Sequence, residues 1–228
     1  MFNFFNPSIF VDSVSTYASE IDFLIGLIFS LVFIPFIISE ILLFTFIFKF
    51  RKKSGVKAEY IEGESVKEKR WISIPHYIVL LLDVIIIIFA IGVWVNVKQD
   101  IPEPDRVIEI EGRQWAWNFR DPGMDGKLGT SDDIVTTNVL NIEVDKVYNF
   151  KLKSVDVLHD FSVPVFRLKQ DAIPGREITG WFKAKKTGEY DIQCAEMCGI
   201  GHGLMSSKIL IKSKKDFTMW LKTKNKDM

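Results

Sequence analysis

The sequence predicts a two-helix transmembrane hairpin followed by an all-β domain, either a sandwich or a barrel. Hydrophobic residues, which make up 48% of the 228-residue chain, crowd into its first part, where two long apolar runs occur. After these runs, apolar and polar residues alternate with a period of two, as in strands that bury one face. The formal net charge is zero. This balance argues against nucleic-acid binding, because there is no basic excess to neutralise phosphates.

The two apolar runs cover residues 23–48 and 72–97. Each exceeds the roughly 20 residues that an α-helix needs to cross the hydrocarbon core of a bilayer. Pro75 falls in the first turn of the second predicted helix, where proline is tolerated. The first run is too long for a cleaved signal peptide and has no basic stretch before it. We therefore expect both runs to span the membrane.

The charges around the two runs predict their orientation. No Lys or Arg precedes Lys49, whereas the segment between the runs carries Lys49, Arg51, Lys52, Lys53, Lys57, Lys67, Lys69 and Arg70. By the positive-inside rule, this segment is cytoplasmic and both ends of the chain lie outside. We expect a multi-pass protein of the bacterial plasma (inner) membrane, with its C-terminal domain on the periplasmic or outer side.

Two carboxylates, Glu40 and Asp83, lie within the apolar runs. Ionised groups are costly in hydrocarbon, so each carboxylate must either reach water near a headgroup region or face a partner protein. Asp83 lies well inside its run, and for this residue we favour a partner. We expect His76, beside Pro75, to be interfacial rather than a metal ligand.

The rest of the chain reads as a stiff, proline-containing linker and a β domain. Strand-like runs cover residues 107–111, 139–144, 147–153, 157–163, 177–183, 189–193 and 206–212. Several short strands at this spacing predict a sandwich or barrel. The predicted organisation is an N-terminal extracytoplasmic segment (1–22), a transmembrane hairpin with a cytoplasmic loop (23–98), a linker (99–106), a β domain (107–214) and a C-terminal tail (215–228). Residues 216–224 predict a short amphipathic helix in the tail.

A polar segment rich in Gly and Asp, Asp121–Asp133, lies between predicted strands. Its composition is similar to that of calcium-binding loops, but its spacing does not fit the EF-hand pattern. We favour a solvated hairpin, because Gly and Asp are typical of turns.

Candidate metal ligands gather in one short segment. It reads Cys194-Ala-Glu-Met-Cys198-Gly-Ile-Gly-His202-Gly-Leu-Met205, and a further candidate, His159, lies on an earlier predicted strand. A mononuclear blue-copper site uses one Cys, two His and a weak Met ligand. This chain has that set and a second thiolate, and two thiolates four residues apart can bridge two copper ions. The glycines of this segment let the backbone bend tightly between the ligands.

Two other interpretations of the cysteines stay open at this point. A disulfide between Cys194 and Cys198 is possible in an extracytoplasmic domain, but it leaves both histidines and Met205 unexplained. A structural zinc site of two Cys and two His fits the spacing, although it does not need Met205. From the chemistry of the ligands we favour copper over zinc.

Several motifs follow one another in a fixed order along the chain. They are Gly112-Arg-Gln-Trp115-Ala-Trp117, Asp156-Val-Leu-His159, Leu168-Lys-Gln-Asp-Ala-Ile-Pro-Gly-Arg176 and the segment from Cys194 to Met205. Together they closely resemble subunit II of cytochrome c oxidase. The resemblance covers essentially the whole chain, including the two-helix anchor, and it implies that the β domain is cupredoxin-like.

The resemblance also implies the metal ligands. The side-chain ligands of a binuclear, mixed-valence copper centre, CuA, would be His159, Cys194, Cys198, His202 and Met205. Glu196 would contribute its backbone carbonyl to one copper. The carboxylate of Glu196 would help to hold a magnesium or manganese ion at the boundary with subunit I.

Further roles follow from the same resemblance. Trp115 would be the residue through which electrons enter from cytochrome c, and Asp156 and Gln114 would belong to the docking area for that partner. Glu68 resembles the carboxylate at the mouth of a proton path. Without the family, Trp115 would read as a core or interface residue and the two carboxylates as solvated groups. Ala116 replaces an aromatic residue that is common between the two tryptophans of the family.

The function implied by the family is that of a subunit of an oxidoreductase. Such a subunit accepts electrons from cytochrome c at CuA and passes them to haem in subunit I, where oxygen is reduced and protons are pumped. The implied partners are subunit I, subunit III, cytochrome c and the membrane, and haem would be present only in the partner subunit. The alternatives are a membrane-anchored copper-binding protein and a structural zinc domain. A quinol-oxidising relative would lack the copper ligands.

Overall fold

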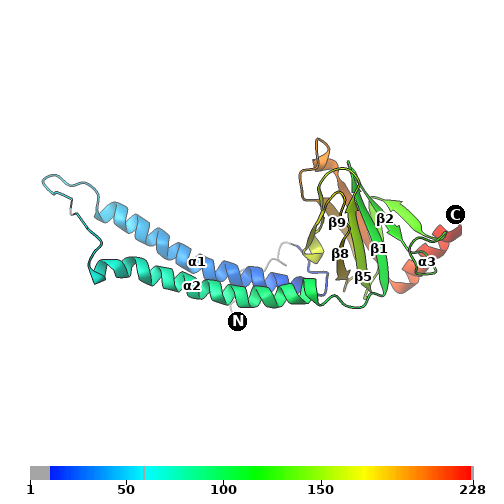
Figure 1. The fold of residues 1–228 in the computed structure, drawn as a ribbon, viewed down its shortest axis with the longest axis horizontal. Coiled ribbons are helices and arrows are strands. Elements are labelled where there is room, and N and C mark those ends of the chain that lie inside the picture. The colour runs from blue at the N-terminus through cyan, green and yellow to red at the C-terminus, as the bar shows by residue number, and fades with distance from the viewer. Residues whose placement is uncertain (1–10, 59, 227–228) are drawn as a thin grey trace. The chain divides into compact units, whose positions relative to one another are not determined.

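The computed structural model describes residues 11–58 and 60–226 (Figure 1). Within this range the chain forms two compact units, one containing residues 22–94 and the other residues 11–21 and 95–226. Residues 1–10 of the predicted N-terminal segment, residue 59 of the predicted cytoplasmic loop and residues 227–228 of the predicted tail lie outside the described residues.

The helical unit is built from two long apolar helices. They are α1 (Ala18–Lys49) and α2 (Val66–Trp94), and a π-helical turn, η2 (Val95–Gln99), continues α2. Both helices are long and apolar enough to cross a membrane. Phe23 near the start of α1 packs edge-to-face on Phe89 near the end of α2, with ring centroids 5.6 Å apart, so the helices run antiparallel (Figure 1). The predicted multi-pass anchor is thus a hairpin of two spans in the described part of the chain.

Helix α2 begins with a capping box formed by Ser65 and Glu68. The Ser65 backbone N–H and hydroxyl donate to Oε2 of Glu68 over 3.0 and 2.7 Å, and the Glu68 N–H donates to Ser65 Oγ over 3.3 Å. Such a box satisfies backbone donors that the first helical turn leaves without partners. The Glu68 carboxylate therefore has a structural role at the start of α2.

The second unit is a sandwich of two five-stranded sheets, which confirms the predicted all-β domain. The first sheet has the order β3-β2-β1-β5-β8 and the second β4-β10-β9-β6-β7. The strands are β1 (Arg106–Arg113), β2 (Ala116–Asp121), β3 (Ile134–Thr137), β4 (Val139–Glu143), β5 (Val147–Ser154), β6 (His159–Val163), β7 (Leu168–Ala172), β8 (Ile178–Lys183), β9 (Gly188–Cys194) and β10 (Ser206–Lys212). The architecture is that of a cupredoxin-like domain.

Aromatic side chains fill the space between the sheets. Phe161 of β6 packs edge-to-face on Trp117 of β2, with ring centroids 5.3 Å apart, and Phe150 of β5 lies 6.0 Å from Phe182 of β8. All four rings are fully buried. Burial of a side chain of this size contributes about 1.5–3 kcal/mol, so these rings are a main source of the domain's stability.

Residues just before α1 form a strap against the sandwich. The Val14 N–H donates to the Val165 carbonyl over 2.8 Å, and the Lys185 N–H donates to the Val14 carbonyl over 2.8 Å. Ser15 forms a β-bridge with Ala184 beyond the end of β8. Backbone groups at the margin of a sheet are left without partners unless another segment pairs with them. The strap provides such pairing and ties the chain before α1 to the β domain.

The hairpin and the C-terminal helix follow their sequence predictions. Strands β2 and β3 pair antiparallel on either side of the Asp121–Asp133 segment, which confirms the predicted hairpin. Asp132 closes this loop by accepting hydrogen bonds from the N–H groups of Met124 and Asp125 over 2.7 and 3.0 Å. Helix α3 (Lys214–Lys226) buries Phe217 and Leu221, as expected of an amphipathic helix.

Candidate metal centre

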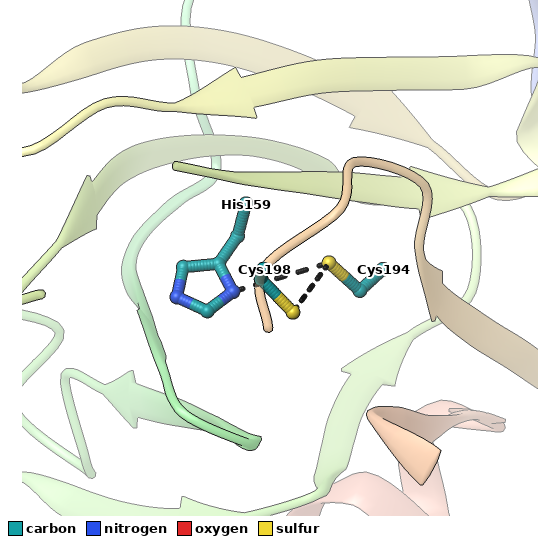
Figure 2. Close-up of side chains that lie close together, drawn as sticks. All are labelled: His159, Cys194 and Cys198. Atoms are coloured by element: carbon teal, nitrogen blue, oxygen red, sulfur yellow. Dashed lines mark hydrogen bonds between the residues drawn. The ribbon is translucent and has the colours of Figure 1, made fainter. Parts of the chain in front are cut away.

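Three strand ends bring the candidate ligands together. Cys194 ends β9, Met205 immediately precedes β10, and their connection contains a short 3₁₀ turn, η4 (His202–Leu204). His159 begins β6, and the register of β6 with β9 places Phe161 opposite Cys194. Figure 2 shows His159, Cys194 and Cys198 converging from these elements. The sheet thus positions residues that are far apart in the sequence.

The two cysteine sulfurs form the middle of the cluster. Both cysteines are free and buried, and their Sγ atoms lie 3.7 Å apart. This distance is far longer than the roughly 2.05 Å of a disulfide bond. Ligand atoms of His159, Cys194 and Cys198 all lie within 4.8 Å of one another, the spacing of groups that can share a metal ion. The two thiols are therefore available as metal ligands.

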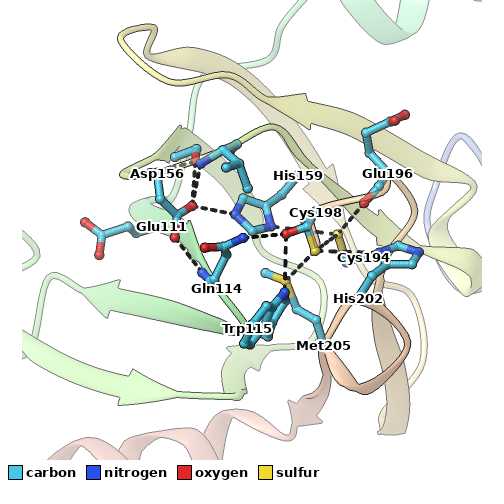
Figure 3. A network of polar contacts seen from close by, with 12 residues as sticks. Glu111, Gln114, Trp115, Asp156, His159, Cys194, Glu196, Cys198, His202 and Met205 are labelled. Carbon is cyan, nitrogen blue, oxygen red and sulfur yellow. Dashed lines mark hydrogen bonds and ion pairs between the residues drawn. The ribbon is translucent and has the colours of Figure 1, made fainter. Parts of the chain in front are cut away.

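Each sulfur has its own imidazole and its own weaker donor (Figure 3). Cys194 Sγ lies 3.9 Å from His159 Nδ1 and 3.2 Å from the Glu196 carbonyl oxygen. Cys198 Sγ lies 3.6 Å from His202 Nδ1 and 3.7 Å from Met205 Sδ. The donor set is therefore balanced around the sulfur pair, with one nitrogen and one weak ligand on each side.

The environment of the thiols affects their protonation. Burial, followed by the neighbouring Cys194 thiol, raises the pKa of Cys198 to about 11. Thiols bind metals as thiolates, and metal binding releases their protons. Without a cation, the Cys198 thiol therefore keeps its proton at neutral pH.

Asp156 contacts the ring of His159 on the side opposite the cysteine sulfurs. Its Oδ1 lies 2.8 Å from His159 Nε2, and its two oxygens accept the N–H groups of Gln114 and Val157, each over 2.6 Å. Burial opposes ionisation of Asp156, but the hydrogen bonds from His159, Gln114 and Val157 outweigh it and lower the pKa. An ionised carboxylate only accepts hydrogen bonds, so His159 donates through Nε2, which leaves Nδ1 as the ring atom that would bind a metal ion in the cluster.

Gln114 and Trp115 form the two-residue turn between β1 and β2. Gln114 Nε2 and Trp115 Nε1 both donate to the Cys198 carbonyl, over 2.8 and 3.3 Å. Trp115 is 38% exposed. It lies so close to Gly201 that an added Cβ there would collide with the ring. Trp115 therefore contacts both the solvent and the backbone of Cys198, a candidate ligand.

Two of the predicted site groups are not members of this cluster. The Glu196 carboxylate is turned away from the sulfurs (Figure 3). Glu68 belongs to the helical unit and lies at the start of α2. Sequence reasoning did not anticipate the contact of Asp156 with His159, although their three-residue separation was a usable signal. It also missed the contact of the buried Trp117 with His159, at a ring separation of 5.9 Å.

The donor atoms fit copper better than zinc. A structural zinc site is closed by four tetrahedral ligands, and two Cys with two His would be enough. Here Met205 Sδ and the Glu196 carbonyl add two further weak donors next to the sulfurs. Thioether is a soft ligand that suits copper. The residues present therefore match a copper pair.

Comparisons with known proteins identify the family to which the chain belongs. Residues 106–213 match the protein family described as "Cytochrome C oxidase subunit II, periplasmic domain". The chain is 34% identical over 213 residues to "Alternative cytochrome c oxidase subunit 2" of Bradyrhizobium diazoefficiens, covering 82% of this chain and 74% of that protein. It is 29% identical over 242 residues to "Cytochrome c oxidase subunit 2" of Cereibacter sphaeroides, covering 93% and 78%.

A solved structure is similar as well. The crystal structure of the periplasmic domain of subunit II of cytochrome oxidase of Bradyrhizobium japonicum is 34% identical, with a TM-score of 0.48, and the match covers 56% of this chain and 98% of that chain. The resemblance inferred from the sequence motifs is thus confirmed by the family match and by the relative that aligns over most of both chains. The chain belongs to the cytochrome c oxidase subunit II family.

Proposed function

We propose that this chain is the electron-accepting subunit of a respiratory cytochrome c oxidase and that its β domain holds a binuclear CuA centre. The observation that carries the proposal is the balanced donor set: two buried sulfurs 3.7 Å apart, with imidazole nitrogens at 3.9 and 3.6 Å. Copper bound there supplies reversible one-electron chemistry. The ligands are His159, Cys194, Cys198, His202, Met205 and the carbonyl of Glu196.

The protein fixes the positions of these ligands and shields most of them from solvent. His159, Cys194, Cys198 and Met205 are all buried, and Asp156 fixes the ring of His159 through Nε2. A metal-ligating histidine whose second nitrogen donates to a carboxylate is held in one orientation. A rigid site needs little rearrangement when its charge changes, which favours rapid electron transfer.

The surface around the loop supports docking of cytochrome c. Met197, Ile200 and Leu204 are 72%, 98% and 85% exposed and lie on the segment that carries the cysteines. Trp115 is exposed next to them and donates to the Cys198 carbonyl. We assign Trp115 as the residue through which electrons enter, with Gln114 and Asp156 in the docking area.

The remaining assignments concern the complex. The partners are subunit I, which carries the haem and reduces oxygen with coupled proton pumping, and subunit III. The Glu196 carboxylate would share a magnesium or manganese ion with subunit I. Glu68 would stand at the mouth of a proton path. The basic segment between the helices supports insertion into a bacterial plasma membrane with the β domain on the periplasmic side.

Electron paramagnetic resonance of the purified full-length chain, loaded with copper, tests the proposal. We expect the spectrum of one unpaired electron shared by two equivalent copper ions. The spectrum of a single copper ion would instead indicate a copper-binding protein of the mononuclear type. A colourless, metal-bound chain with no copper signal would indicate a structural zinc domain, and either result would contradict the proposal.

A further inference from the structure

Asp83 lies at the middle of α2, far along the helix from any other charged side chain. The candidate membrane span that contains it runs from Val66 to Gln99. Between Arg70 and Lys98, Asp83 is the only Asp, Glu, Lys or Arg. At a rise of about 1.5 Å per residue, each of these two cations lies about 20 Å away along the helix. The hydrocarbon core of a bilayer is about 30 Å thick, so the short side chain of Asp83 cannot reach either headgroup region.

Asp83 also lies outside the contact between the two helices. Phe89 packs on Phe23 of α1, and Leu82 and Ile86, on the same side of α2 as Phe89, are half-buried. Asp83 is exposed, and it forms no hydrogen bond or ion pair with any residue that the structure describes. The residues one helical turn away on its own side of α2 are exposed and apolar: Val79, Leu80 and Ile87. Asp83 is therefore a single acidic group on an otherwise apolar face.

The negative charge of Asp83 needs a partner from outside the hairpin. An ionised group at the centre of a bilayer is costly, and such groups pair with other polar groups inside helix bundles. Helix α1 carries no Lys or Arg between Phe23 and Phe48, and α2 carries none between Arg70 and Lys98. A second copy of the hairpin would bring another carboxylate instead of a cation. The compensating group therefore belongs to a different membrane protein.

We propose that Asp83 forms an ion pair with an arginine or lysine on a transmembrane helix of subunit I, and that the face of α2 around Asp83 packs on that helix. The inference rests on the proposed function, which names subunit I as the partner. The apolar residues around Asp83 exclude water from the pair, and this strengthens the attraction between the two charges. The ion pair also selects the partner helix, because an apolar helix in its place would leave the carboxylate uncompensated.

Co-purification with subunit I tests the ion pair in the complete oxidase. Subunit I is purified through an affinity tag from membranes that contain the wild-type chain, Asp83→Glu, Asp83→Asn or Asp83→Leu. Quantitative immunoblotting measures how much of this chain is retained per subunit I, relative to its amount in the membrane. Removing one partner of a buried ion pair is strongly destabilising, so Asp83→Asn and Asp83→Leu should be retained at least about tenfold less than the wild type. Asp83→Glu keeps the charge and should restore most of the retention.

Val84→Leu is the matched control, because Val84 is an exposed neighbour that points to another side of α2. This variant should be retained like the wild type. Asp83→Leu inserts into the membrane at least as readily as the wild type, since Leu is far more favourable than Asp at the centre of a membrane helix. The copper spectrum of each solubilised variant reports whether its β domain is folded.

Three results would overturn the ion pair. Wild-type retention of Asp83→Leu would mean that no partner contacts Asp83. Wild-type retention of Asp83→Asn alone would mean that the partner is a neutral hydrogen-bonding group. A loss in Asp83→Glu as large as that in Asp83→Leu would mean that the shape of the side chain matters and its charge does not.

The copper spectrum distinguishes a failure of this inference from a failure of the proposed function. A wild-type chain that shows the shared-electron copper signal, together with equal retention of all Asp83 variants, overturns the ion pair and leaves CuA standing. A wild-type chain that is retained with subunit I in a charge-dependent way but lacks this copper signal contradicts the CuA centre and leaves the ion pair standing. A wild-type chain that is not retained with subunit I contradicts both.

Discussion

The two halves of the candidate metal centre are built in different ways. His159 and Cys194 lie on β6 and β9, where the sheet register fixes them, and Asp156 holds His159 from behind. Cys198 and His202 lie on the connection to β10, and part of that connection is solvent-exposed. The first half is therefore held by the fold, whereas the second depends on contacts from Gln114 and Trp115 to its backbone.

The two halves would therefore meet two different requirements of a site for a copper pair. The strand-held half supplies a fixed, buried nitrogen and sulfur before any metal is present. The loop-held half completes the set, with a half-exposed histidine and glycines that allow its sharp bends. Gly199 illustrates the second requirement, because its φ of +118° is a conformation that L side chains rarely adopt. Perturbing each half separately should therefore give different results.

The largest effect is expected from Cys198→Ser. This change removes the thiolate that the loop contributes to the sulfur pair, so no second bridge remains between two copper ions. We expect complete loss of the shared-electron signal, while circular dichroism of the β domain stays unchanged. A variant that kept the signal would show that Cys198 does not bridge.

Removing each imidazole in turn should distinguish the halves directly. His202 is half-buried, whereas His159 is fully buried. In His202→Gly, added imidazole can enter from solvent and should restore most of the copper signal. In His159→Gly, the same imidazole should restore little, because the cavity is closed. The measurement is signal intensity against imidazole concentration, and equal rescue of both variants would contradict the difference between the halves.

The sequence predicted the candidate ligands better than it predicted the residues that hold those ligands in place. Residue types and spacing were enough to single out Cys194, Cys198, His202 and Met205 as candidate ligands, because metal chemistry restricts which side chains serve, and the structure brings these side chains together. The contact of Asp156 with His159 was missed, since an exposed-looking carboxylate shows no periodicity. The strap at Val14 was missed for a similar reason: pairing with a distant sheet edge leaves no local pattern.

The strands show the same limit. The long strands β1 and β5 were predicted from alternation, as were the apolar helices from length. Strands β2, β3 and β7 were not predicted. β3 is only four residues long and lies at a sheet edge, and β7 exposes part of its length. Short edge strands carry too few alternating positions for a pattern to stand out, so tertiary pairing decides their conformation.

A smaller effect is expected when the support of the strand-held half is weakened. Asp156→Asn removes the negative charge that fixes the His159 ring, but leaves every ligand in place. Copper affinity should fall by about 10–100-fold, as is typical of residues behind a ligating histidine, with a normal spectrum at saturating copper. Competition with a copper chelator measures this change. Glu177→Gln is the control: this exposed carboxylate contacts Lys151 of β5, and the variant should have wild-type affinity.

The smallest effect is expected from a single methyl group added to the loop-held half. The backbone at Gly201, with φ −92° and ψ 10°, accepts alanine, so Gly201→Ala acts only through the collision of its Cβ with the Trp115 ring. Overpacking of this kind costs about 1–3 kcal/mol and displaces whichever group yields more easily. Trp115 is partly exposed and yields, so the copper spectrum should persist while electron uptake from cytochrome c slows.

Gly203→Ala is the matched control for that variant. An added Cβ at Gly203 meets nothing within 4 Å, so the same methyl group on the same loop should leave electron uptake unchanged. Stopped-flow mixing with reduced cytochrome c measures both variants against the wild type. Equal rates for Gly201→Ala and Gly203→Ala would mean that the position of Trp115 does not limit electron uptake. If both variants take up electrons equally slowly, electron uptake depends on the conformation of the loop backbone. The loop-held half would then limit electron uptake independently of Trp115.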